Sequence, residues 1–279
     1  MGLFTKKDPC AVCGGKVTGL FPHKIDGMLV CSECYGTVDL PQGAEKNMTV
    51  EDFKQYMAFR EENAQLKQRF KTTHQVDFGW LDDKFLFDME NRLLCMDKNL
   101  GKTIFEGSQI QSFEIREDQE ILFRGSAEEL LRYTSTVPQR AMALAPQLEV
   151  YRMQAQMKRE MERQMERMKE QNGESGYYHQ PDIDIPEPFR MFYVDIYFEH
   201  PFWNVYTADM RAPEFDNENP DINDYLNSYN NAVKMLEELA QSLMKLAFPG
   251  ASERTAAAAG GVTMAGSGVF PLPAWQWIP

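Results

Sequence analysis

The stretches CAVCGG, at residues 10–15, and CSECYG, at residues 31–36, decide how the chain begins. Each contains two cysteines, and together they give the spacing C-x2-C-x17-C-x2-C. Two thiolates on one tight turn can reach the same ion, and four thiolates fill a tetrahedral zinc shell with Zn–S bonds of about 2.3 Å. The spacing therefore predicts a structural zinc site whose ligands are Cys10, Cys13, Cys31 and Cys34.

The segment between the cysteine pairs predicts a small ribbon that depends on its metal. Gly14 and Gly36 lie just after the two pairs, where glycine tolerates the positive φ angles that such turns need. Residues 17–21 and 28–30 are predicted to pair as short strands around Asp26-Gly27. So short a segment cannot bury enough core to fold alone. We expect zinc to contribute on the order of 10 kcal/mol or more to its folding.

Other interpretations of these residues exist. A redox dithiol pair and an iron site are the alternatives to zinc, and His23 is an alternative ligand. A shell closed by four cysteines is structural, since catalytic zinc usually keeps a position for water. The fifth cysteine, Cys95, lies in an apolar run and is predicted to be a buried, inert thiol.

Composition narrows the class of protein. The 279 residues include 29 basic and 42 acidic side chains, giving a net charge of −13. An acidic chain repels phosphate backbones and anionic lipid surfaces, which argues against unspecific binding to nucleic acid or membranes. The cysteine pattern is typical of a metal site and not of a disulfide framework. We therefore expect the protein in a reducing compartment. Without a signal peptide or a membrane-spanning run, a cytoplasmic location is expected.

After the ribbon, the pattern predicts a linker helix and then a series of strands. The helix is expected within residues 48–70, with Thr49 as its N-cap and Asp52 completing a capping box. Residues 85–87 and 93–96 flank a predicted hairpin turn at 88–91, and a second turn is predicted at 97–101. The remaining strands are expected at three places: residues 103–105, 110–115 and 121–123.

Residues 126–188 are predicted to interrupt these strands. They are expected to begin helically at 127–131 and to continue as a long charged helix from about 147 to 170. Along that helix runs a methionine stripe, consisting of Met153, Met157, Met161, Met165 and Met168. Such a stripe either packs within its own chain or docks a partner helix, including that of a second copy. Acidic loops at 182–187 and 214–221 lack the EF-hand order, so solvated loops are expected there rather than a calcium site.

The sheet is predicted to resume and to end in a helix. Phe192, Val194, Ile196 and Phe198 alternate with polar residues, which indicates a half-buried strand. His200-Pro201 breaks this run, and a partner strand is expected at 202–207. The helix after Asn219, its predicted N-cap, carries an apolar stripe that should pack on the sheet. Residues 251–279 are rich in Ala and Gly and are predicted to be a low-complexity tail.

Several of these runs together resemble an uncharacterised bacterial family. They are MGLF at 1–4, the two cysteine pairs, TVEDF at 49–53, FREEN at 59–63, FYVDI at 192–196, HPF at 200–202 and DY at 224–225. The resemblance implies an N-terminal four-cysteine ribbon, a helix, and then a pleckstrin-homology-like (PH-like) domain. Members often end in a second four-cysteine ribbon, which residues 251–279 do not contain.

The expected fold class is therefore α+β. Its parts are a zinc ribbon at 1–40, a linker helix at 48–70, a bent antiparallel PH-like domain at 74–248 with the helical insertion at about 126–188, and the tail at 251–279.

No catalytic motif is present: the sequence lacks G-x-S-x-G, H-E-x-x-H, a Walker A loop and G-x-G-x-x-G. The sequence thus favours a non-enzymatic zinc-binding adaptor that binds protein partners through its ribbon and PH-like surfaces. The alternatives are nucleic-acid binding through the ribbon and lipid binding by the PH-like domain, and the second rests on fold analogy alone.

Overall fold

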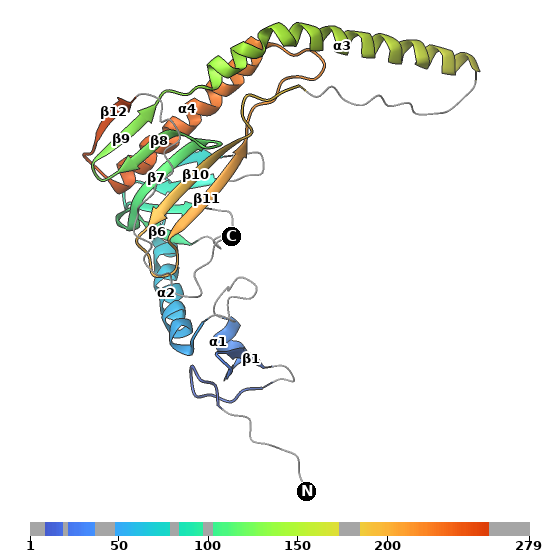
Figure 1. Cartoon of the computed structure of the whole chain (residues 1–279). Coiled ribbons are helices and arrows are strands. Elements are labelled where there is room, and N and C mark those ends of the chain that lie inside the picture. Colours follow the sequence, from blue (N-terminus) through green and yellow to red (C-terminus); the bar gives the residue numbers. More distant parts are fainter. Residues whose placement is uncertain are drawn as a thin grey trace. The chain divides into compact units, whose positions relative to one another are not determined.

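The computed structural model (Figure 1) describes residues 9–18, 22–36, 48–78, 84–96, 103–172 and 185–256, without the side chains of 169–172. Within these residues the fold is mixed α+β, with four α-helices and three sheets. They form two compact units. One combines the residues up to Gln111 with Ile196–Tyr206, and the other combines Ser112–Asp195 with the described residues from Thr207 to Ala256. No helix in the described part of the chain is both long and apolar enough to cross a membrane.

The first unit begins with a β-hairpin. β1 (His23–Ile25) pairs antiparallel with β2 (Met28–Val30). The turn between them consists of Asp26 and Gly27, whose φ angles are 51° and 74°. Two positive φ angles give the turn a twist that matches its strands, and Asp-Gly adopts them readily. The strand predicted at 17–21 is wrong for residues 17 and 18, because the first strand adjoins the turn directly; residues 19–21 lie outside the described part.

Helix α2 (Val50–Arg69) confirms both the predicted helix and its cap. The Thr49 hydroxyl accepts a hydrogen bond from the Asp52 backbone N–H, and the Asp52 carboxylate accepts one from the Thr49 N–H. Asn63 is buried and exchanges two hydrogen bonds with the backbone of Ile104, at 2.7 and 3.1 Å. These two bonds anchor α2 to strand β6 (Ile104–Glu106).

The first unit also contains a four-stranded antiparallel sheet. Its strands, in spatial order, are β3 (His74–Asp77), β4 (Lys84–Asp88), β5 (Leu93–Met96) and β6. The predicted hairpin between β4 and β5 is confirmed, and buried Asp88 shapes it by accepting hydrogen bonds from the backbone and side-chain N–H groups of Asn91. The turn predicted at 97–101 lies outside the described residues.

A six-stranded sheet follows. Its spatial order is β11 (Val205–Arg211), β10 (Met191–Phe198), β7 (Ile110–Glu117), β8 (Glu120–Ser126), β9 (Glu129–Tyr133) and β12 (Ser252–Ala256). The predicted apolar face of β10 is confirmed, since Phe192, Val194, Ile196 and Phe198 are all buried. Strand β11 begins at Val205 rather than at residue 202.

Two strands of this sheet contradict the sequence-based predictions. Residues 127–131 were expected to be helical, but β9 occupies residues 129–133 and pairs antiparallel with β8. Strand β12 falls inside the predicted low-complexity tail, yet it pairs in parallel with β9. Each strand supplies a hydrogen-bonding edge for the other, and this pairing outweighs the local helical preference of Glu and Leu.

Two helices complete the second unit. α3 (Val137–Asn172) begins well before the predicted residue 147 and continues through Pro146. The Ser135 hydroxyl accepts the Val137 N–H at its start. α4 (Ile222–Ala247) is capped by Asp221 and not by Asn219, because the Asp221 carboxylate accepts the N–H groups of the first turn. α4 packs on β8 and β9 and contacts α3. Its predicted stripe is confirmed at four fully buried leucines: Leu236, Leu239, Leu243 and Leu246.

Candidate metal centre

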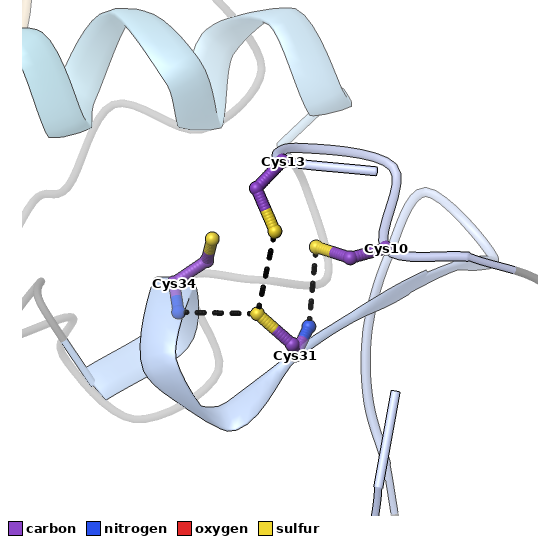
Figure 2. A group of neighbouring side chains, drawn as sticks. All are labelled: Cys10, Cys13, Cys31 and Cys34. Carbon is purple, nitrogen blue, oxygen red and sulfur yellow. Dashed lines mark hydrogen bonds between the residues drawn. The ribbon is translucent and has the colours of Figure 1, made fainter. Parts of the chain in front are cut away.

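Four cysteine side chains converge in the first unit (Figure 2). The sulfur atoms of Cys10, Cys13, Cys31 and Cys34 all lie within 4.8 Å of one another. The Cys13 and Cys31 sulfurs are 3.7 Å apart. Four sulfurs arranged tetrahedrally at about 2.3 Å from one ion would be about 3.8 Å from each other. The spacing of these sulfurs therefore fits a single shared ion.

Each cysteine pair is presented by its own local structure. Cys10 and Cys13 lie on a tight turn in which the Cys10 carbonyl accepts the Gly14 N–H at 2.8 Å, and Gly14 has the positive φ of 71° expected of it. Cys31 follows β2 directly, and Cys34 lies in the short helix α1 (Ser32–Gly36). The prediction of a positive φ at Gly36 is wrong, because this residue ends α1.

Backbone N–H groups point at three of the four cysteine sulfurs. Gly15 N lies 3.4 Å from the Cys13 sulfur, Cys31 N lies 3.3 Å from the Cys10 sulfur, and Cys34 N lies 3.4 Å from the Cys31 sulfur. Such donors orient the ligands of a metal and offset the negative charge of a thiolate. The fold thus prepares these sulfurs for their deprotonated, metal-binding form.

The pKa values of Cys10 and Cys34 are shifted in opposite directions. Burial opposes ionisation of Cys10, but N–H groups of Cys13, Cys31 and Val12 outweigh it and lower the pKa of Cys10 to about 6. Burial raises the pKa of Cys34, and its hydrogen bonds with Cys31 and Cys13 and the nearby charge of Cys10 raise it further. Four thiolates so close together repel one another, and a divalent cation relieves that repulsion.

The surroundings of the cysteines are largely apolar. Cys10, Cys31 and Cys34 are buried, whereas Cys13 is exposed. The three buried cysteines belong to a core cluster with apolar residues of the hairpin and of α2, which include Ile25, Val30, Val50, Phe53 and Tyr56. None of the five cysteines forms a disulfide. A shell of four sulfurs with this apolar backing has no position for a reacting ligand, and so fits a structural ion.

The other candidates do not join this centre. The ring of His23 stacks on Tyr35, with centroids 3.7 Å apart, and His23 does not belong to the group of converging ligand atoms. Cys95 is buried in β5, as predicted. In the described acidic loop, Glu218 and Asp221 pair with Arg159 and Arg152 of α3. Among the described residues, the four cysteines are the one group with metal-binding geometry.

Two aromatic residues of this region were not predicted from the sequence. Phe202 belongs to the same buried cluster as Cys10, Cys31 and Cys34, and Trp203 packs against that cluster. Both lie between β10 and β11, far along the chain from the cysteines. The sequence near them shows only the break at His200-Pro201. This break indicates a loop but does not indicate which residues the loop packs against.

Comparison with known proteins finds one family match, and it covers the segment that contains the four cysteines. A family described as "Domain of unknown function (DUF4428)" matches residues 9–56, which span both cysteine pairs and the start of α2. No curated protein and no solved structure shows a significant match to the chain. The N-terminal segment is therefore similar to a ribbon-like domain of unknown function with four cysteines placed for metal binding.

Proposed function

We propose that the four cysteines hold one structural Zn²⁺ and that the chain is a non-enzymatic protein that binds protein partners. The observation that carries the metal assignment is the convergence of four sulfurs within 4.8 Å. An all-thiolate tetrahedral shell suits zinc among the abundant divalent ions, while calcium and magnesium prefer oxygen ligands. Such a shell gives shape to a segment too small to fold alone and leaves no coordination position for catalysis.

The charges near the centre support a protein partner over nucleic acid. Within the described part of the ribbon, Lys16 and Lys24 are balanced by Asp26 and Glu33. Met28, beside the hairpin turn, is 49% exposed. A surface that exposes an apolar side chain and has as many acidic as basic residues suits binding to a protein. Binding to a phosphate backbone requires several uncompensated positive charges.

A PH-like domain remains our interpretation of the rest of the fold. Its support is the succession of antiparallel strands from β3 to β8, their continuation in β10 and β11, and the closing helix α4. On this interpretation, β9 and α3 are an insertion, and the sheet offers a second surface for partners. Lipid binding is the alternative for this domain, and co-sedimentation with anionic liposomes tests it.

Elemental analysis of the purified, reduced protein tests the metal assignment. We expect about one zinc per chain, because four thiolates complete one tetrahedral shell. The variant Cys31→Ser should lose this zinc. The matched control Cys95→Ser changes a buried cysteine outside the centre and should keep it. Protein without zinc, or equal zinc in both variants, would overturn the assignment.

Affinity capture with three baits tests the interaction role. The wild-type chain should retain a specific protein, and both Cys31→Ser and Met28→Glu should lose it, the latter while keeping its zinc. Titration with DNA and RNA at physiological salt tests the alternative. A salt-dependent complex with nucleic acid, or capture that does not depend on either residue, would argue against a protein-binding ribbon.

A further inference from the structure

The long helix α3 has two contrasting faces in the second unit. One face is held by its own chain: Leu148 and Ala155 are buried, Arg152 donates to the Pro220 carbonyl at 2.9 Å, and Arg159 donates to the Glu218 carbonyl at 3.1 Å. At about 100° per residue, these four side chains share one side of the helix.

The methionine stripe lies on the other face. Met153, Met157, Met161 and Met168 are between 47% and 63% exposed, and Val150 continues the stripe at 54%. Their mean direction is about 180° from the face that holds Leu148 and Ala155. Met165 is half-buried, but packing within the described part of the chain leaves the rest of the stripe uncovered. Six of the seven large apolar side chains that are exposed in the described structure lie on α3.

Beyond Arg159, the described side chains of α3 make no hydrogen bond or ion pair with another described element. In Figure 1, α3 continues well past the end of α4. A helix in water takes most of its stability from packing of an apolar face, so an unsupported stretch of this length is marginal by itself. Burial of the stripe would supply the missing stabilisation.

We propose that the methionine stripe binds the same stripe of a second copy of this chain, with the two α3 helices antiparallel. From Val150 through the five methionines, the steps between neighbours are three, four, four, four and three residues. This order is the same from either end. An antiparallel second copy thus places Val150 opposite Met168, Met153 opposite Met165, and Met157 opposite Met161 of that copy, which is a self-complementary, two-fold interface.

The charges beside the stripe complement each other in this arrangement. Glu149 precedes Val150 and Arg167 precedes Met168, so the two charges are five helical turns apart and project in the same direction. A two-fold axis places the same flank of both helices on one side of the interface. Glu149 of each copy then lies beside Arg167 of the other, with an offset of about 3 Å along the helix axis. Glu160, near the midpoint of the same flank, is balanced by Arg163 one turn later in its own helix.

This inference is independent of the proposed zinc site, which lies in the other unit. Sedimentation velocity of the full chain over a wide concentration range tests it. We expect a wild-type dimer, and Met157→Lys/Met161→Lys should be monomeric with an unchanged circular dichroism spectrum. Cys31→Ser should still dimerise, which separates failure of the zinc assignment from failure of this interface.

Charge reversal tests the antiparallel orientation. Glu149→Arg and Arg167→Glu should each weaken the dimer by roughly tenfold. In either variant, residues 149 and 167 of opposite copies carry the same charge and repel each other at both ends of the interface. An equimolar mixture of these two variants should recover dimerisation, since a chain of one variant places two arginines opposite the two glutamates of the other. The control Glu166→Arg reverses a charge on the opposite face and should leave the dimer intact.

Three results would overturn the proposal. The first is a wild-type monomer at every concentration, which would leave the stripe to another occupant such as residues 257–279 of the same chain. The second is a dimer that the two lysine substitutions do not affect. The third is failure of the mixed charge variants to recover association, which would exclude the antiparallel pairing.

Discussion

The ring of Phe202 meets the ring of Tyr56 edge-on, with their centroids 5.1 Å apart. Tyr56 belongs to α2, Phe202 lies between β10 and β11, and both are members of the buried cluster that includes Cys10, Cys31 and Cys34. The core behind the four cysteines is therefore shared with a distant loop. Binding of a metal and packing of that loop should stabilise each other.

Phe202→Ala tests this coupling. Removal of a buried phenylalanine is expected to lower the free energy of unfolding by about 3–5 kcal/mol. It should also weaken zinc binding, because the binding free energy of a structural zinc includes that of folding its site. Unfolding curves and competition with a chelator measure the two effects. Phe215→Ala, in the second unit, should reduce stability without changing zinc affinity, and equal affinities in both variants would contradict the coupling.

Gly125→Ala should destabilise the second unit. A Cβ at this position of β8 would collide with the ring of Phe113 and would lie 2.8 Å from the sulfur of Met244 on α4. Phe113 is fully buried on the neighbouring strand, so it has little room to move. We expect a loss of about 1–3 kcal/mol in thermal or denaturant unfolding. Gly36→Ala, where a Cβ would meet nothing within 4 Å, should be close to neutral.

His200 should make stability depend on pH. Its Nδ1 accepts the Phe202 N–H at 3.0 Å, and burial lowers the pKa of His200 from 6.5 to about 4. The folded state therefore holds a neutral imidazole. The contribution of neutral His200 to the free energy of unfolding is complete above pH 6.5 and is lost as the pH falls toward 4.

The size of this loss has an upper limit of roughly 3 kcal/mol. Denaturant unfolding at a series of pH values measures it. His200→Asn keeps a hydrogen-bond acceptor but does not titrate, so its stability should vary less over this range. The same pH dependence in the variant would assign the effect to other groups.

Tyr229→Phe removes a donor to a buried carboxylate. The Tyr229 hydroxyl donates to Glu117 at 2.5 Å, and the Ser135 hydroxyl donates to its other oxygen at 2.6 Å. Burial raises the pKa of Glu117, although these two hydrogen bonds partly offset the effect. A raised carboxyl pKa stabilises the folded state at low pH, and this stabilisation is lost as the pH rises through the folded-state pKa.

We therefore expect Tyr229→Phe to cost about 1–3 kcal/mol in the free energy of unfolding, with the larger loss at the higher pH, where the carboxylate is charged. Chemical denaturation at two pH values measures this loss. Tyr225→Phe is a matched control on the same helix, since the buried Tyr225 hydroxyl has no hydrogen-bond partner within the described structure. An equal or larger loss in the control would show that the bond to Glu117 contributes little.

Local sequence signals predicted many of the elements near the candidate site. The capping box at Thr49 marks where α2 begins, and the turn around Asp88–Asn91 marks the β4–β5 hairpin, because each depends on hydrogen bonds between residues close in the chain. The helix predicted at residues 127–131 is wrong, since Glu and Leu favour helix locally but residues 129–131 are in strand β9. Their strand conformation depends on pairing with β8 on one side and with β12, more than a hundred residues later, on the other.

By itself, the sequence determined that four sulfurs would meet. A tight turn holds the first cysteine pair, the start of α1 holds the second, and a hairpin of a few residues brings the pairs together, so the centre needs only local geometry. Tertiary structure alone decided that Phe202 supports this centre, that β12 pairs with β9, and that one face of α3 is held while most of the methionine stripe is exposed. These outcomes depend on which distant surfaces become buried together, a property that the spacing of neighbouring residues does not encode.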